Sequence, residues 1–132
     1  MISSAHYIYD DDEIRVKYSN LYYIQNKFYY LTIDKDIKLK NVKISNTQEF
    51  VPIIKYFNTN EEIISFLKEI TYVNIEGTTG YISHFYDWNV AHGLYDSLYP
   101  LYLTYLKFLN EDQEDKFNMF INLKYIAGWR FP

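Results

Sequence analysis

The sequence predicts an α/β fold in which N-terminal antiparallel strands pack beside a Rossmann-like half. In residues 13–57, short apolar runs alternate with polar residues, which is the period of half-buried strands. In residues 58–132, the period lengthens to that of a helix, and the order becomes strand–helix–strand–helix–strand. That order is typical of a parallel, doubly wound sheet. A chain of 132 residues also suits a single domain, which is expected to cover residues 1–132.

Five short strands are expected in the β-rich part. They cover residues 14–18, 21–24, 28–33, 42–44 and 50–57. Gln25-Asn26-Lys27 favours a hairpin turn between the second and the third strand. Pro52 lies near the start of the last strand, where a missing N–H is tolerated. Residues 1–12 are expected to precede these strands as a loose acidic lead.

The α/β part is predicted to begin with a helix over residues 60–70. Thr59 and Glu62 have the spacing of a capping box, in which each side chain reaches a backbone N–H near the helix start. The apolar residues that follow recur at helical spacing: Ile63, Ile64, Phe66, Leu67 and Ile70. Residues 72–75 are expected to form a short buried strand after this helix.

The longest helical pattern covers residues 89–109 and follows a loop predicted over residues 76–88. The glycine pair of that loop has no lysine after it, so it does not match a phosphate-binding P-loop. Pro100 would bend the helix by removing a backbone hydrogen bond. The run 117–123 fits a strand or a helix, and a strand is favoured. One apolar stripe follows the long helix: Leu94, Leu98, Leu101, Tyr105 and Phe108 or Leu109.

Composition narrows the functional classes. The net charge of −4 argues against a nucleic-acid partner and an anionic membrane surface, because both need a basic footprint. The absence of cysteine excludes disulfides, thiolate zinc sites and cysteine nucleophiles. No signal peptide and no apolar run near the ~18 residues of a membrane span are visible, so a cytoplasmic location is expected. The high tyrosine content, 16 residues, has two explanations. One is the codon usage of an AT-rich genome, and the other is an aromatic face that binds sugars.

Four polar residues share one face of the predicted long helix. Asn89, His92, Asp96 and Tyr99 are spaced three, four and three apart. Asp96 would fix the tautomer of the His92 imidazole, which makes His92 a candidate proton acceptor. The alternative reading is an ordinary helix pair with no chemical role.

Three further candidates, His84, Asp87 and Trp88, come just before this helix, at the end where its dipole attracts anions. The alternative is that Asp87 or Asn89 caps the helix and Trp88 belongs to the core. A metal site built from His84, His92 and Asp96 has no known ligand spacing.

Residues 84–102, HFYDWNVAHGLYDSLYPLY, resemble the acceptor-side motif of the family-61 glycosyltransferases. The motif has an Asn, a His three residues later, an Asp four residues after that, and then Leu-x-Pro-Leu. The segment is most similar to the branch of EGF-domain and O-linked-mannose N-acetylglucosaminyltransferases. The specific match covers about 20 residues, with looser agreement from about residue 50 onward.

The resemblance implies the N-terminal, acceptor-side domain of a GT-B type fold. It implies inverting, metal-independent transfer from a nucleotide sugar to a hydroxyl of a carbohydrate or glycoprotein acceptor, with no cofactor. His92 would act as general base or acceptor ligand, Asp96 would orient it, and Asn89 would fix the loop or a substrate hydroxyl. His84, Asp87, Trp88 and Tyr99 would complete the substrate site.

The family's enzymes hold the nucleotide diphosphate in a second domain, and this chain offers only Arg130 near its end for that purpose. The chain is therefore expected to be incomplete alone and to need a second chain with the donor domain. The acidic run of residues 10–13 is similar to a D-x-D metal–nucleotide motif but reads as a solvated stretch. The alternative function is a non-catalytic, tyrosine-rich module that binds a protein or a glycan.

Overall fold

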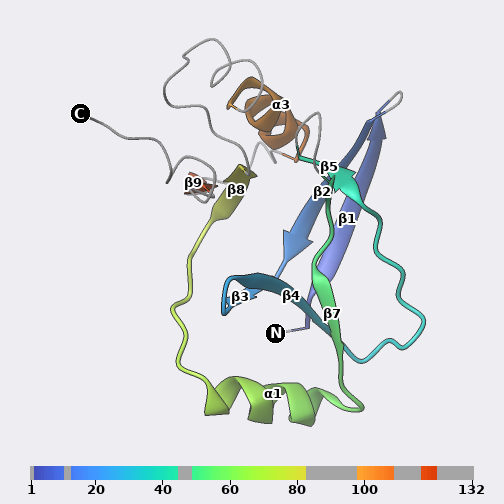
Figure 1. Ribbon diagram of the computed structural model, residues 1–132, viewed down its shortest axis with the longest axis vertical. Coiled ribbons are helices and arrows are strands. Elements are labelled where there is room, and N and C mark those ends of the chain that lie inside the picture. Colours follow the sequence, from blue (N-terminus) through green and yellow to red (C-terminus); the bar gives the residue numbers. More distant parts are fainter. Residues whose placement is uncertain (1, 11–12, 45–48, 83–97, 109–116, 122–132) are drawn as a thin grey trace. The chain divides into compact units, whose positions relative to one another are not determined.

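The computed structural model describes residues 2–10, 13–44, 49–82, 98–108 and 117–121 (Figure 1). The chain divides into two compact units. Unit 1 comprises Met1–Lys43 and Glu49–Asn74, and unit 2 comprises Ile44–Gln48 and Ile75–Pro132. Each unit is described by itself.

Unit 1 contains three small sheets. A hairpin, β1-β2, and a pair, β5-β6, are antiparallel, and the third sheet has the order β3-β4-β7. In that third sheet β3 pairs antiparallel with β4, whereas β7 pairs parallel with β4. The strands are β1 (Ser4–Asp10), β2 (Glu13–Ser19), β3 (Tyr22–Ile24), β4 (Lys27–Thr32), β5 (Val42–Lys43), β6 (Glu49–Phe50) and β7 (Ile53–Tyr56).

The β3–β4 hairpin confirms the turn predicted around Asn26. Gln25 and Asn26 connect the two strands with φ values of 50° and 65°. Two consecutive positive φ angles define a type I′ turn, whose twist matches that of the paired strands. Asparagine tolerates this left-handed backbone better than most residues, so the local sequence favours the hairpin.

The N-terminal segment is a paired strand, so the prediction of a loose acidic lead is wrong. Strand β1 pairs with β2 along its whole length, from Ser4 opposite Ser19 to Asp10 opposite Glu13. Along β1, Ala5, Tyr7 and Ile8 are half-buried, whereas Ser4, His6 and Tyr9 are exposed. The segment is thus one strand of a hairpin, and Asp10 lies opposite Glu13 at the end of the paired region.

Helix α1 (Asn60–Glu69) confirms the helix predicted over residues 60–70. The Thr59 hydroxyl accepts the Glu62 N–H at 3.2 Å, as expected for an N-cap. The Glu62 carboxylate instead accepts the N–H of Asn58 at 2.8 Å, one residue before the position that a capping box uses. Both bonds stabilise the helix start by satisfying backbone donors that have no partner within the helix.

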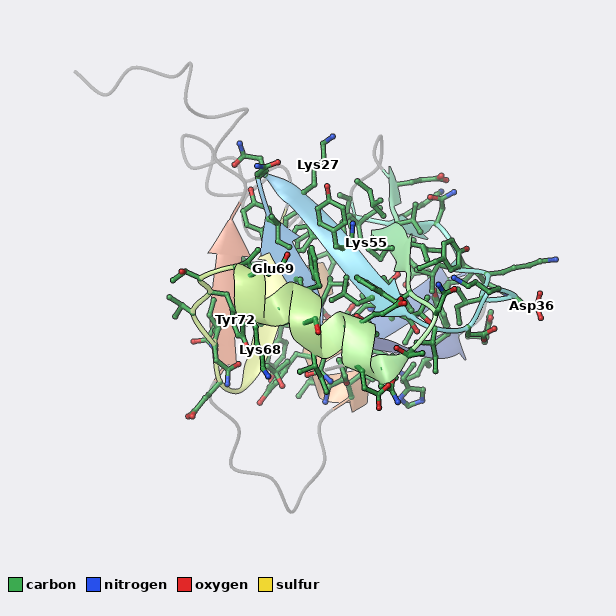
Figure 2. The ribbon with its side chains drawn as sticks, turned by 90° about the horizontal axis from the view of Figure 1, so that it is seen from below. Lys27, Asp36, Lys55, Lys68, Glu69 and Tyr72 are labelled. Carbon is green, nitrogen blue, oxygen red and sulfur yellow. The ribbon has the colours of Figure 1, made fainter. Side chains whose placement is uncertain are left out.

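The core of unit 1 lies between α1 and strand β4. Leu31, Ile63 and Leu67 are each at most 3% exposed and form one cluster. Figure 2 shows α1 lying across this sheet, with Lys68 and Glu69 near its C-terminal end. The other face of β4 is also covered, since Tyr30 on that face is 3% exposed and its ring contacts that of Tyr18.

Unit 2 contains strand β8 (Thr78–Ile82), helix α3 (Tyr99–Phe108) and strand β9 (Phe117–Ile121). The two strands pair in parallel, with Thr78 opposite Phe117 and Ile82 opposite Ile121. The strand favoured for residues 117–123 is therefore confirmed over Phe117–Ile121. Residues 78–82 were predicted as loop, and that prediction is wrong.

The predicted α/β class with a Rossmann-like half is wrong, and so is the GT-B type arrangement expected with it. The described residues form four sheets of two or three strands and two α-helices, which makes the class sheet-rich. Parallel pairing occurs at β4–β7 and at β8–β9, but these pairs belong to different sheets.

Two strands predicted from the sequence differ in the structure. Residues 72–75 form no strand, and Tyr72, Val73 and Ile75 are 54%, 86% and 61% exposed. The run 50–57 is divided into β6 and β7, with Pro52 between them. Proline has no N–H to donate to a ladder, so it separates the two strands.

Candidate functional site

The sequence-predicted site falls almost entirely outside the described residues. His84, Asp87, Trp88, Asn89, His92 and Asp96 lie in the range 83–97, which the structure does not describe. Their proposed chemistry stays a prediction. The described member of the set, Tyr99, lies on α3 and is 54% exposed.

Helix α3 carries an exposed stripe of large side chains, which we call the α3 stripe: Tyr99, Tyr102 and Leu106. Their exposed fractions are 54%, 56% and 43%. The spacings of three and four residues place all three on one face of the helix. The stripe also continues the face that sequence spacing assigned to Asn89, His92, Asp96 and Tyr99.

The opposite face of α3 is the packed one. Leu101, Tyr105 and Phe108 are half-buried, and they belong to the apolar stripe that the sequence predicted. Within unit 2, α3 contacts strand β8. Helix α3 therefore has apolar side chains on two sides, and one of these sides is exposed.

Polar groups around the α3 stripe are few. Within helix α3, Tyr99–Phe108, Lys107 is the one charged residue. The Thr104 hydroxyl donates to the carbonyl oxygen of Pro100 at 2.9 Å, so its hydrogen goes to the helix itself. The α3 stripe thus offers two tyrosine rings with their hydroxyls and a leucine.

Some tyrosines of unit 1 pack against one another, whereas Tyr9, Tyr23, Tyr56 and Tyr72 are exposed. Tyr18 makes edge-to-face contacts with Tyr7, Tyr30 and Phe50, with ring centroids 6.5, 6.3 and 6.3 Å apart. Burial raises the pKa of Tyr18 above its usual value, and the neighbouring Tyr7 hydroxyl adds to that shift. This cluster joins the β1–β2 hairpin to the third sheet and has the character of packing.

Three lysines in unit 1 are held against aromatic rings, and the Lys35 ammonium lies 5.4 Å from the centre of the Tyr56 ring. The Lys40 ammonium lies 4.6 Å from the centre of the Tyr9 ring, and the Lys40 N–H donates to the Tyr7 hydroxyl at 3.1 Å. The Lys55 ammonium lies 5.0 Å from the Phe66 ring. Such contacts stabilise the fold by about 0.5–1 kcal/mol at exposed sites. The Lys40 contact holds the loop after β4 against strand β1, and the Lys55 contact holds strand β7 against helix α1.

No acidic or histidine cluster suited to a metal ion occurs in the part of the chain that the structure describes. The acidic run of residues 10–13 is described at its two ends, where Asp10 faces Glu13 across the hairpin. The Glu13 carboxylate accepts a hydrogen bond from Arg15 at 2.9 Å. The alternative metal site at His84, His92 and Asp96 lies outside the described residues.

Neither α1 nor α3, the helices within the described ranges, has the length and apolar character of a membrane span. No protein-family model, curated protein or solved structure matches the chain.

Sequence reasoning missed Tyr102 and Leu106 as candidates. Continuing the spacing from Tyr99 by three and then by four residues leads to both of them. Spacing shows that they share a helix face, but it does not show whether that face is exposed.

Proposed function

We propose that this chain is a non-catalytic protein-interaction module. Helix α3 would place the α3 stripe in an apolar groove of another protein. The observation that carries the proposal is the exposure of three large side chains at positions i, i+3 and i+7 of one helix. That pattern is the anchor spacing by which a helix binds in a groove.

The chemistry of the stripe favours a protein over a glycan. Sugar sites combine an aromatic ring with several directed hydrogen-bonding groups. On the α3 stripe, the hydroxyls of Tyr99 and Tyr102 are the polar groups, and Leu106 supplies only apolar surface. Tyrosine is enriched among the residues that dominate protein interfaces, because it combines a large apolar ring with a polar tip.

Site-specific photo-cross-linking tests this proposal in the full chain. A photoreactive residue replaces Tyr102, and a control chain carries it at Lys68, an exposed position on α1. We expect a discrete adduct from position 102 that disappears when Tyr99 and Leu106 are both changed to aspartate. An adduct of equal yield from position 68, or one that survives both aspartates, contradicts the proposal.

The second candidate is the acceptor-side segment of a sugar transferase, supported by the motif spacing in residues 84–102. In this proposal His92 takes the proton of an acceptor hydroxyl and Asp96 orients it, which would supply roughly 10²–10⁴-fold in rate. Tyr99, exposed on α3, would lie on the same helix face.

A transfer assay tests this second proposal. The purified chain alone is expected to show no sugar transfer from a nucleotide sugar, and transfer would contradict the proposed need for a donor domain. In a longer or two-chain version, His92→Ala would abolish transfer while the fold stays intact. Activity retained in that variant would remove His92 from the proposed role.

A further inference from the structure

We draw no further inference here: the strongest candidate, the exposed apolar edge at strand β7 of unit 1 with Val51, Ile53 and Tyr56, carries no proposal because nothing in the described part of the structure shows what covers it.

Discussion

Ser3 and Leu31 join the N-terminus of unit 1 to its central strand. The Ser3 N–H donates to the Leu31 carbonyl oxygen at 2.9 Å, and the Leu31 N–H donates to the Ser3 hydroxyl oxygen at 2.8 Å. The same hydroxyl donates to the carbonyl oxygen of Asn20 at 2.6 Å. Ser3 is 3% exposed, so these bonds are shielded from water. One serine therefore holds together the start of the chain, the turn before β3, and strand β4.

Replacement of this serine should destabilise unit 1. In Ser3→Ala the Leu31 N–H loses its acceptor in a buried place, which costs about 1–3 kcal/mol. We expect the free energy of unfolding, measured by urea denaturation, to fall by that amount. Ser4→Ala is the matched control, because Ser4 is exposed. Equal stability of the two variants would show that the buried hydroxyl contributes nothing.

The α1–β4 core predicts a second stability difference. Leu67→Ala removes a side chain that is 3% exposed and leaves a cavity against Leu31 and Ile63. We expect a loss of about 2–5 kcal/mol in urea denaturation. Val73→Ala removes apolar atoms from a side chain that is 86% exposed, and its effect should stay within about 0.5 kcal/mol. A large loss in the valine variant would contradict the described packing.

Alkaline pH should weaken unit 1 through its buried tyrosines. Burial is the main cause that raises the pKa of Tyr18, Tyr22 and Tyr30 above the ordinary value of 10.0. As pH rises past that value, the unfolded chain loses these phenolic protons before the folded chain does. The stability that these groups contribute is complete below pH 10.0 and declines above it.

Urea denaturation at increasing pH measures this decline. Tyr18→Phe should make it shallower, because that variant has one fewer buried phenol to ionise. Tyr9→Phe is the control, since Tyr9 is 60% exposed. If the decline in stability with pH is the same in Tyr18→Phe as in the wild type, the ionisation of Tyr18 does not contribute to it.

The two faces of α3 should respond differently to charge. Tyr102→Asp places a carboxylate where the side chain is 56% exposed, and we expect a change within about 0.5 kcal/mol in the free energy of unfolding. Tyr105→Asp places the same charge on the half-buried face, where desolvation should cost several times more. Thermal unfolding followed by circular dichroism compares them. A larger loss of stability in Tyr102→Asp than in Tyr105→Asp would contradict the packing described for α3.

Local signals in the sequence predicted the elements that depend on neighbouring residues. The turn at Gln25 and Asn26 and the helix cap at Thr59 are each decided within four residues of chain. The sequence also predicted which face of α3 packs, because Leu101 and Tyr105 recur at helical spacing.

Pairing between distant segments was not predictable in this way. Strand β8 contains Gly80 and follows Gly77, so its composition indicated a loop, yet it pairs with β9 far along the chain. Residues 72–75 have the composition of a strand but remain exposed. Strand propensity measures how a residue fits a pleated surface and does not reveal whether a partner strand exists. The exposure of Tyr102 likewise depends on tertiary packing.

The most direct test of the proposed function is the affinity for the protein recovered by cross-linking at position 102. Isothermal titration calorimetry compares the wild-type chain with Tyr102→Ala and with the control Lys68→Ala. An anchoring tyrosine contributes about 2 kcal/mol or more, so Tyr102→Ala should weaken binding by about 30-fold, while Lys68→Ala leaves it unchanged. Equal affinity of Tyr102→Ala and the wild type would contradict the account.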